Sequence, residues 1–222
     1  QKISKNNYTL PYVDRRDIYN NFYLDNEGNI VFTKSSTLGN TEVVGYLQIL
    51  SKPLLKDTLV RKEIALDNFY LDDVKLKVDN ANKRYLLNSF YYKQKRGNVV
   101  GLFAAIWDRD GDSIWVNNYL QLDDTIRSLA KRDASIKTAF NNYFIKNIIV
   151  RKDGGYILIA EVYYTQTLNN NNSWNRWDNF YLPYSNFYRY YNYYDPFYRS
   201  MYRFNNTPDT KFIYNNIMAI SF

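Results

Sequence analysis

The sequence predicts an all-β fold built from antiparallel repeat units. The chain has 222 residues, with 24 Tyr and 13 Phe but only 8 Gly, and aromatic residues favour strands over helices. Three segments share one pattern, in which an apolar strand ends at an Asp-containing turn and two further strands follow. Such internal repetition is typical of repeat architectures. We expect a single repeat domain over residues 1–222.

The first unit covers residues 17–66. Its turn at 24–29 reads LDNEGN, and Asn, Asp and Gly provide the positive φ values and side-chain hydrogen bonds that tight turns need. Apolar runs at 30–33 and 44–50 predict two buried strands, and 58–66 predicts a fourth strand at the edge. Four strands per unit is typical of a β-propeller blade.

The second unit covers residues 74–120 and repeats this order. Its turn at 78–83 reads VDNANK, strands are expected at 84–90 and 100–106, and an edge strand is expected at 113–120. The unit therefore also has four predicted strands.

The third unit covers residues 145–222 and lacks a fourth strand. Its turn at 150–155 reads VRKDGG, and strands are expected at 156–160 and 216–222. Three units cannot close a propeller ring, which typically has four to eight blades. The sequence therefore predicts an incomplete ring or a fragment of a longer protein, and a β-sandwich is the alternative.

Two insertions explain why the units are longer than the roughly 40 to 50 residues of common propeller repeats. The first is a helix predicted over 123–144, with Asp123 or Asp124 as its N-cap. Its apolar stripe is predicted to consist of Ile126, Leu129, Ala130, Ile136 and Phe140. The second is an aromatic loop over 165–213.

The turn-and-strand sequences VDNANKRYLLNSF at 78–90 and IIVRKDGGYILIAE at 148–161 resemble those of uncharacterised exported β-propeller-like repeat proteins of Bacteroidota. The resemblance extends over most of the chain, and its motifs are structural. It implies export to the periplasm or the cell surface, and it assigns no catalytic residue.

The composition excludes several classes of active site. The chain contains no His and no Cys, which excludes a Ser-His-Asp triad, a Cys-His dyad and a zinc-type site. The net charge of +7 is spread along the chain, so we expect no nucleic-acid partner. No apolar run approaches the roughly 18 to 20 residues of a membrane helix, so we expect no membrane span.

Asp108, Asp110 and Asp112 alternate around Gly111, and such carboxylates suggest a calcium loop. The spacing differs from that of an EF-hand, because Gly is fourth instead of sixth and Tyr119 occupies the twelfth position, which should be Glu. Asp followed by Gly before an apolar strand is typical of a tight hairpin. We interpret the run as a structural turn and expect no cofactor, with calcium as the alternative.

Other carboxylates have simpler interpretations. Asp25, Asp79 and Asp153 recur at equivalent positions, which indicates a shared turn requirement rather than a shared reaction. Glu161 lies in an otherwise apolar run and is a weak acid-base candidate, because a buried carboxylate needs a partner or a raised pKa.

The segment 174–204 is about half aromatic and interrupts the third unit where a hairpin needs only a few residues. Tyr, Trp and Arg at loops on a rigid scaffold are typical of binding surfaces. The predicted binding residues are Trp174, Arg176, Trp177, Tyr181, Tyr184, Tyr188, Arg189, Tyr190, Tyr191, Tyr193, Tyr194, Tyr198 and Arg199.

These observations favour a non-catalytic binding or scaffold module of an exported bacterial protein. We expect its partner to be a protein or another domain of the same longer chain, because aromatic residues with Arg suit interface anchoring. Glycan binding by aromatic stacking is the alternative, either in a carbohydrate-binding protein or in a glycoside hydrolase that uses two carboxylates. A loop that only covers its own fold, and single-stranded nucleic acid, are the weaker interpretations.

Overall fold

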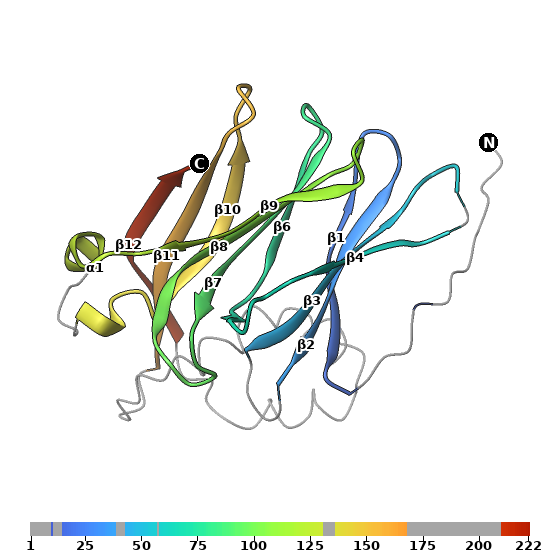
Figure 1. Cartoon of the computed structure of the whole chain (residues 1–222). Helices are drawn as coiled ribbons and strands as arrows, with labels where there is room; N and C mark the ends of the chain where they lie inside the picture. Colours follow the sequence, from blue (N-terminus) through green and yellow to red (C-terminus); the bar gives the residue numbers. More distant parts are fainter. Residues whose placement is uncertain (1–9, 11–14, 39–42, 57, 131–135, 168–209) are drawn as a thin grey trace, which may run out of the picture. The chain divides into compact units, whose positions relative to one another are not determined.

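The structure is a computed structural model (Figure 1), and it describes residues 10, 15–38, 43–56, 58–130, 136–167 and 210–222. The chain forms two compact units. From here on, 'unit' means one of these two parts and not a repeat unit of the sequence. The first consists of Gln1–Ile126 with Val150–Gly155, and the second of Arg127–Ile149 with Tyr156–Phe222. Antiparallel sheets make up most of the described residues of both units, which confirms the predicted all-β class.

The first unit contains a nine-stranded antiparallel sheet with the order β1-β2-β3-β5-β7-β8-β9, in which β4 pairs with β3 and β6 with β7. We call β1 to β4 the first meander and β6 to β9 the second. The strands are β1 (Asp17–Leu24), β2 (Ile30–Thr37), β3 (Val44–Lys52), β4 (Val60–Ile64), β5 (Tyr70–Leu71), β6 (Lys75–Asp79), β7 (Arg84–Tyr92), β8 (Val99–Asp108) and β9 (Ser113–Gln121).

The short strand β5 joins the two meanders. Leu71 pairs with Val44 of β3 on one side and with Tyr91 of β7 on the other. Strands β4 and β6 pair with the remaining length of the same edges of β3 and β7. Each meander therefore keeps its own antiparallel order. Strand β5 links them, because it pairs with β3 of the first meander and with β7 of the second.

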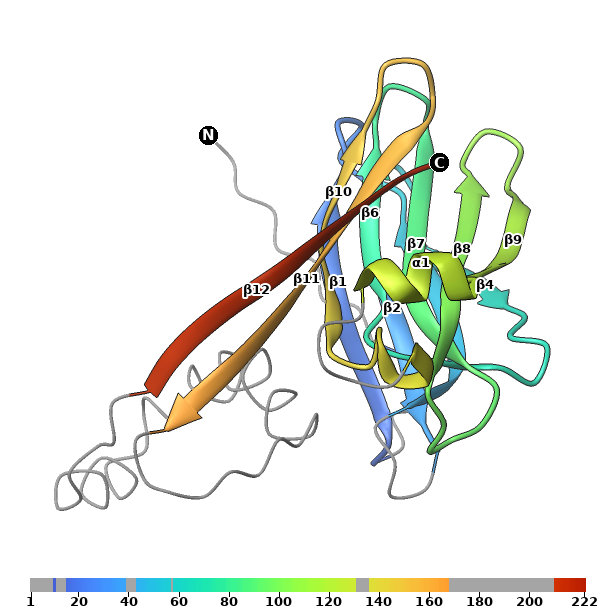
Figure 2. The same ribbon diagram turned by 90° about the vertical axis from the view of Figure 1, so that its left-hand side faces the viewer.

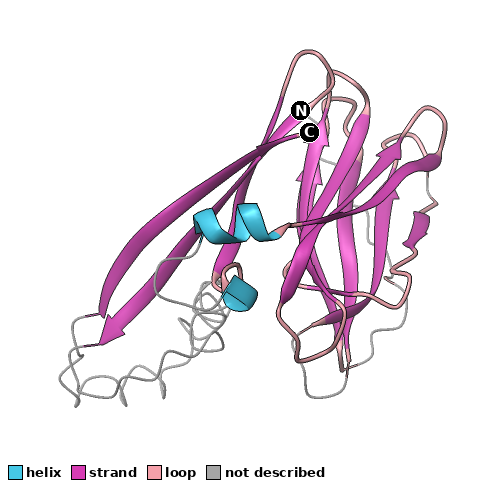
Figure 3. Cartoon of the chain, turned by 60° about the vertical axis from the view of Figure 1, so that its left-hand side comes forward, coloured by secondary structure: helices cyan, strands magenta, loops and turns pink. Residues whose placement is uncertain are grey.

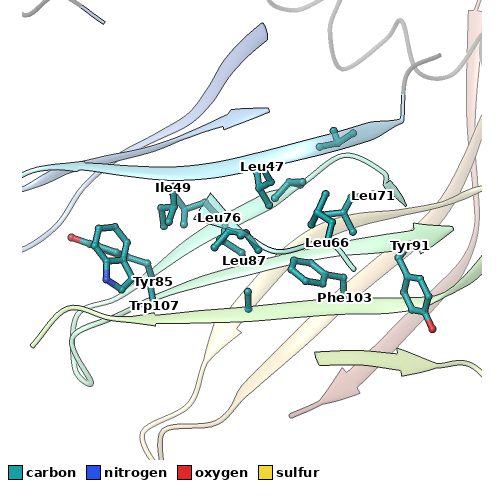
Figure 4. Packing of buried hydrophobic residues seen from close by; sticks show 14 of the residues in the cluster. Leu47, Ile49, Leu66, Leu71, Leu76, Tyr85, Leu87, Tyr91, Phe103 and Trp107 are labelled. Carbon is teal, nitrogen blue, oxygen red and sulfur yellow. The ribbon is translucent and has the colours of Figure 1, made fainter. Parts of the chain in front are cut away.

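The core of the first unit is formed by both meanders. In Figure 4, Leu47 and Ile49 of β3 point towards Leu76, Leu87 and Phe103 of the second meander. These side chains alternate along their strands, because successive residues of a strand face opposite sides of the sheet. Burial of one such Leu or Phe stabilises the fold by about 1.5–3 kcal/mol. The cluster comprises Val31, Val44, Leu47, Ile49, Ile64, Leu66, Leu71, Val74, Leu76, Tyr85, Leu87, Tyr91, Phe103, Ala105 and Trp107.

Strand β7 is the most completely buried strand of the sheet. Every residue that follows Arg84 in it is buried, so both of its faces are covered. Its neighbour β8 keeps Gly101 where a Cβ atom would overlap the carbonyl oxygen of Leu120 in β9 and the ring of Tyr91. A glycine is therefore required for β8 and β9 to approach each other at this point.

The second unit contains a three-stranded sheet, which we call the third meander (Figure 2). Its strands are β10 (Tyr143–Val150), β11 (Tyr156–Thr167) and β12 (Thr210–Ser221) in the order β10-β11-β12. Strand β11 lies in the middle and pairs antiparallel with β12 along its whole length.

The helical insertion is shorter than the sequence predicts. Of the span 123–144, the described residues form helix α1 (Asp124–Ala130), a 3-10 turn η1 (Ile136–Thr138) and the start of β10 (Figure 3). Asp123 is the N-cap, because its Oδ1 accepts a hydrogen bond of 2.8 Å from the backbone N–H of Ile126.

The predicted apolar stripe is wrong for the helix itself, although Phe140, which lies beyond the helix, is buried. Leu129 is 82% exposed and Ile126 is exposed, while Arg127 is buried with its guanidinium 5.9 Å from the ring centre of Phe140. A helix of seven residues makes only two turns, which is too short for a stripe of the predicted length. Within the described ranges, no helix is long and apolar enough to cross a membrane.

Candidate functional site

The predicted aromatic binding surface lies outside the described residues, and this applies to every predicted binding residue from Trp174 to Arg199. The structure does describe the two strands that flank it. Strands β11 and β12 pair up to Thr167 opposite Thr210, so the two residues that flank segment 168–209 are partners in one ladder. The segment is therefore attached at the end of an antiparallel hairpin.

The turn between β1 and β2 holds a connected group of polar side chains. The Oδ1 atom of Asp25 accepts hydrogen bonds from the backbone N–H groups of Glu27 at 2.9 Å and Asn29 at 2.8 Å. Its Oδ2 atom accepts a bond of 2.9 Å from the side-chain amide of Asn29. Gly28 takes a φ of 82°, which is a conformation that favours glycine. Asp25 therefore fixes the shape of its own turn.

Two residues of the second meander reach the same carboxylate. Tyr85 in β7 donates its hydroxyl hydrogen to Oδ2 of Asp25 at 2.9 Å. Arg109, which follows β8, forms an ion pair with Asp25 and lies 3.3 Å from the carboxylate of Glu27. Its guanidinium also lies over the ring of Tyr85, 5.5 Å from the ring centre. We call Asp25, Glu27, Tyr85 and Arg109 the Asp25 cluster.

Burial and hydrogen bonding set the protonation states of this cluster. Burial alone would raise the pKa of Asp25, but hydrogen bonds from Asn29 and Tyr85 and the charge of Arg109 outweigh it and lower the pKa. Burial and the hydrogen bond to Asp25 raise the pKa of Tyr85 to about 12. At neutral pH the cluster holds a carboxylate anion, a neutral hydroxyl and a guanidinium cation, an arrangement that joins the two meanders through fixed charges.

The Asp25 cluster contains two residues that the sequence did not single out. Tyr85 is 60 residues from Asp25, and Arg109 is 84 residues from it. Neither belongs to a motif with Asp25. The available signal was that Tyr85 lies near the start of a buried strand and that Arg109 directly follows another strand, since buried polar groups need partners.

The two other equivalent aspartates also accept hydrogen bonds within their turns. Asp79 accepts bonds from the backbone N–H of Asn82 at 3.0 Å and from its side-chain amide at 2.8 Å. Asp153 accepts a bond from the backbone N–H of Gly155 at 3.1 Å and forms an ion pair with Arg151. Asp79 is buried, whereas Asp153 is exposed. The three positions share their turn chemistry but differ in their surroundings.

Neighbouring turns of the two meanders also bond to each other. The backbone N–H of Asn26 donates to Oδ1 of Asn80 at 2.9 Å, and the backbone N–H of Arg109 donates to the carbonyl of Lys83 at 3.1 Å. Figure 1 shows the β1-β2, β6-β7 and β8-β9 turns at one end of the first unit. This end is therefore held together by polar contacts as well as by the Asp25 cluster.

The three aspartates near Gly111 form a turn with ion pairs. Oδ1 of Asp108 accepts a hydrogen bond of 3.0 Å from the backbone N–H of Asp110. Asp110 forms an ion pair with Lys83 at 3.0 Å, and Asp112 forms one with Lys62 at 2.9 Å. In the part of the chain that the structure describes, no group of three or more acidic, His or Cys side chains is arranged to hold a metal ion. The three carboxylates thus have lysine and backbone partners.

Glu161 also has a cationic partner. Its Oε1 lies 3.0 Å from Nζ of Lys146 in the neighbouring strand β10, and only 15% of its side chain is exposed. Lys146 is largely exposed, so the ion pair lies at the surface of the three-stranded sheet. The pair gives the carboxylate a structural role in holding β10 against β11.

Comparison with known proteins gives no relative: no family model, no curated protein and no solved structure matches the chain.

Proposed function

We propose that the chain is a non-catalytic binding or scaffold module of an exported bacterial protein, and that residues 168–209 form its interaction surface. The observation that carries this proposal is the pairing of Thr167 with Thr210 at the end of the β11-β12 ladder. This pairing supports a binding segment at the end of a β-hairpin, because the residues on both sides of the segment lie in paired strands. Loops on such scaffolds are where binding residues concentrate.

The composition of the segment supports contact with another protein. About half of the residues from 174 to 204 are aromatic, and four Arg residues are interspersed among them. Tyr and Trp provide large contact areas with few rotatable bonds, and with Arg they are enriched among the residues that dominate binding energy. The β11-β12 ladder does not need this segment, since two residues suffice for a hairpin.

The described carboxylates support the non-catalytic part of the proposal. A general acid needs a raised pKa or an accessible proton, whereas the pKa of Asp25 is lowered by the hydrogen bonds that it accepts. Asp110, Asp112 and Glu161 are ion-paired with lysines. These contacts are those of structural residues.

The repeat architecture that we propose is propeller-like. Strands β1 to β4 and β6 to β9 have the same antiparallel order, and side chains from both meanders form one core. A propeller likewise consists of neighbouring four-stranded units, and in this chain β5 additionally joins the two meanders in one sheet. The exported location is inferred from the resemblance of the repeat units to proteins of Bacteroidota.

A loop replacement tests the proposed interaction surface. Residues 168–209 are replaced by Asn-Gly, which can close a two-residue turn between Thr167 and Thr210. We expect the far-ultraviolet circular dichroism and the unfolding midpoint to change little, while partners cross-linked to the intact chain in extracts of the native organism are lost. A second variant keeps the length of the segment and replaces only its Tyr, Trp and Phe residues by Ser, and the intact chain is the control.

The result separates the two binding hypotheses. Both variants should lose the cross-linked partner, because the aromatic side chains carry the contact. A glycan array with the same three proteins tests the carbohydrate alternative. A signal that depends on the aromatic residues would favour a glycan over a protein as the partner. Partner capture that persists after loop replacement contradicts the proposed surface.

A further inference from the structure

The third strand of each meander differs in what covers its second edge. Strand β3 pairs with β2 and β4, and β8 pairs with β7 and β9. Strand β12 has the same position in the third meander and pairs with β11. Within the described ranges, no strand occupies the other edge of β12. We call this edge of β12, which carries no strand among the described residues, the open edge.

Hydrogen-bond parity identifies the backbone groups on this open edge. Tyr156 and Phe222 exchange two backbone hydrogen bonds, of 3.1 and 2.9 Å. Antiparallel partners alternate between bonded and non-bonded pairs, and Ala219 is opposite Ile159 in the same ladder. Counting back from Phe222, Ile217 and Ala219 belong to non-bonded pairs. Their N–H and C=O groups consequently point away from β11.

The side chains near this edge are apolar and uncharged. Ile217 is 77% exposed, Ala219 is exposed, and Met218 and Ile220 are half-buried. The sequence from 216 to 222 contains no charged residue and no proline, which are the features that commonly protect an edge strand from pairing.

A bulge limits the length of the open edge. Glu161 is opposite Ile217 and Tyr163 is opposite Tyr214, so two residues of β12 face the single residue between them on β11. The regular part of the edge thus begins at Ile217. The edge strand β1 of the nine-stranded sheet differs, because it contains Asp17 and a bulge.

We propose that the open edge of β12 binds an extended, uncharged strand of a partner polypeptide, which runs antiparallel to Ile217–Ile220 and forms a fourth strand of the third meander. Strand β9 provides the chemical model, because it covers the equivalent edge of β8 and its sequence SIWVNNYLQ carries no charge. Backbone hydrogen bonds give such strand addition its affinity, and alternate side chains give it specificity. The residues of this site belong to the described part of the chain and not to the segment 168–209.

A peptide with the β9 sequence SIWVNNYLQ serves as the probe. Hydrogen exchange of backbone amides, measured by NMR on the whole chain, should slow by about tenfold or more at Ile217 and Ala219 when the peptide is saturating. A scrambled peptide of the same composition is the control. Unchanged exchange at both amides with the β9 peptide overturns the proposal.

Variants of Ala219 test the backbone contact. Ala219→Pro removes an N–H that faces the open edge without removing a hydrogen bond to β11, and it should lower peptide affinity by about tenfold or more, since each 1.4 kcal/mol is tenfold. Ala219→Val keeps the N–H and should retain binding. Equal affinity of the two variants contradicts the proposal.

Two further measurements keep the test valid if the proline variant does not fold. N-methylation of the peptide at alternate residues should abolish binding in one of the two registers only, because only one set of N–H groups faces β12. Equal loss in both registers, or no loss in either, contradicts strand addition. Protection of Ile217 and Ala219 that rises with protein concentration in the absence of peptide would assign the edge to a second copy and overturn the proposal.

Discussion

Replacement of Tyr85 by Phe removes one hydroxyl from the Asp25 cluster and leaves the ring in place. The hydroxyl donates a buried hydrogen bond of 2.9 Å to the carboxylate of Asp25, and a hydrogen bond to a charged group stabilises a fold by about 1.5–3 kcal/mol. Burial, and next the hydrogen bond to Asp25, raise the pKa of Tyr85 to about 12, so the hydroxyl is protonated and can donate this bond at neutral pH.

Urea unfolding followed by Trp fluorescence measures this loss. Trp107 is a suitable reporter because its ring lies 5.4 Å from that of Tyr85. We expect a lower midpoint with an unchanged slope, since the variant exposes the same surface on unfolding.

Tyr119→Phe is the matched control. Its hydroxyl is buried without a hydrogen-bond partner among the described residues, while its ring packs against Phe69 and Phe103. Removing an unsatisfied hydroxyl should change stability by less than about 0.5 kcal/mol or increase it. Equal losses for the two variants, or a loss below about 0.5 kcal/mol for Tyr85→Phe, would refute the role given to the Asp25 contact.

The same pair of proteins has a defined dependence on alkaline pH. The pKa of Tyr85 is higher in the folded state than in the unfolded state, so its stabilisation is present below pH 10 and is lost as the pH rises to about 12. The stability difference between the wild type and Tyr85→Phe should therefore shrink over this interval. A difference that stays constant would contradict the buried, neutral state of the hydroxyl.

Three other predictions concern the turns and the core. Asp25→Asn should cost about 3–5 kcal/mol because it breaks a buried ion pair, whereas Asp153→Asn on the exposed turn should cost less than about 1 kcal/mol; chemical unfolding measures both. The pKa of Asp25 is lower in the folded state than its unfolded value of 3.8. The ionised carboxylate therefore stabilises the fold above pH 3.8, and this stabilisation is lost as the pH falls through the folded pKa. The free energy of unfolding should consequently change less with acid pH in Asp25→Asn than in the wild type. Gly101→Ala should destabilise by about 2 kcal/mol or more because its Cβ would overlap the backbone of β9, while Gly111→Ala, which meets flexible side chains, serves as the control in the same thermal melts.

The sequence predicts strands well where one face is buried and turns carry strong signals. The run at 30–33 lies within β2, and the edge strand expected at 113–120 is β9. Both follow turns with Asp and Gly, where local hydrogen bonds decide the conformation. The helix differs because its apolar residues at helical spacing also suit a short helix followed by a strand. Leu129 and Ile126 are exposed, so periodicity alone did not identify the buried face.

The candidate sites divide in the same way. The turn function of Asp25 is local, and it follows from residues within four positions of it. The contacts with Tyr85 and Arg109 depend on how the second meander packs on the first, which no spacing in one sequence indicates. The parity of β12 likewise needs the register between Tyr156 and Phe222. The aromatic segment stays a prediction from composition.

Repetition of a residue does not repeat its environment in this fold. Asp25 and Asp153 each bond the backbone two residues further along the chain, so both turns keep an aspartate for the same local reason. Asp25 is also covered by Arg109 from another meander, and its side chain is inaccessible. Asp153 pairs with Arg151 of its own turn and is exposed. The Asp25 side chain thus becomes part of the contact between repeats because a neighbouring repeat supplies a cation to it. Arg109, rather than the recurring aspartate, therefore distinguishes the Asp25 turn from the Asp153 turn.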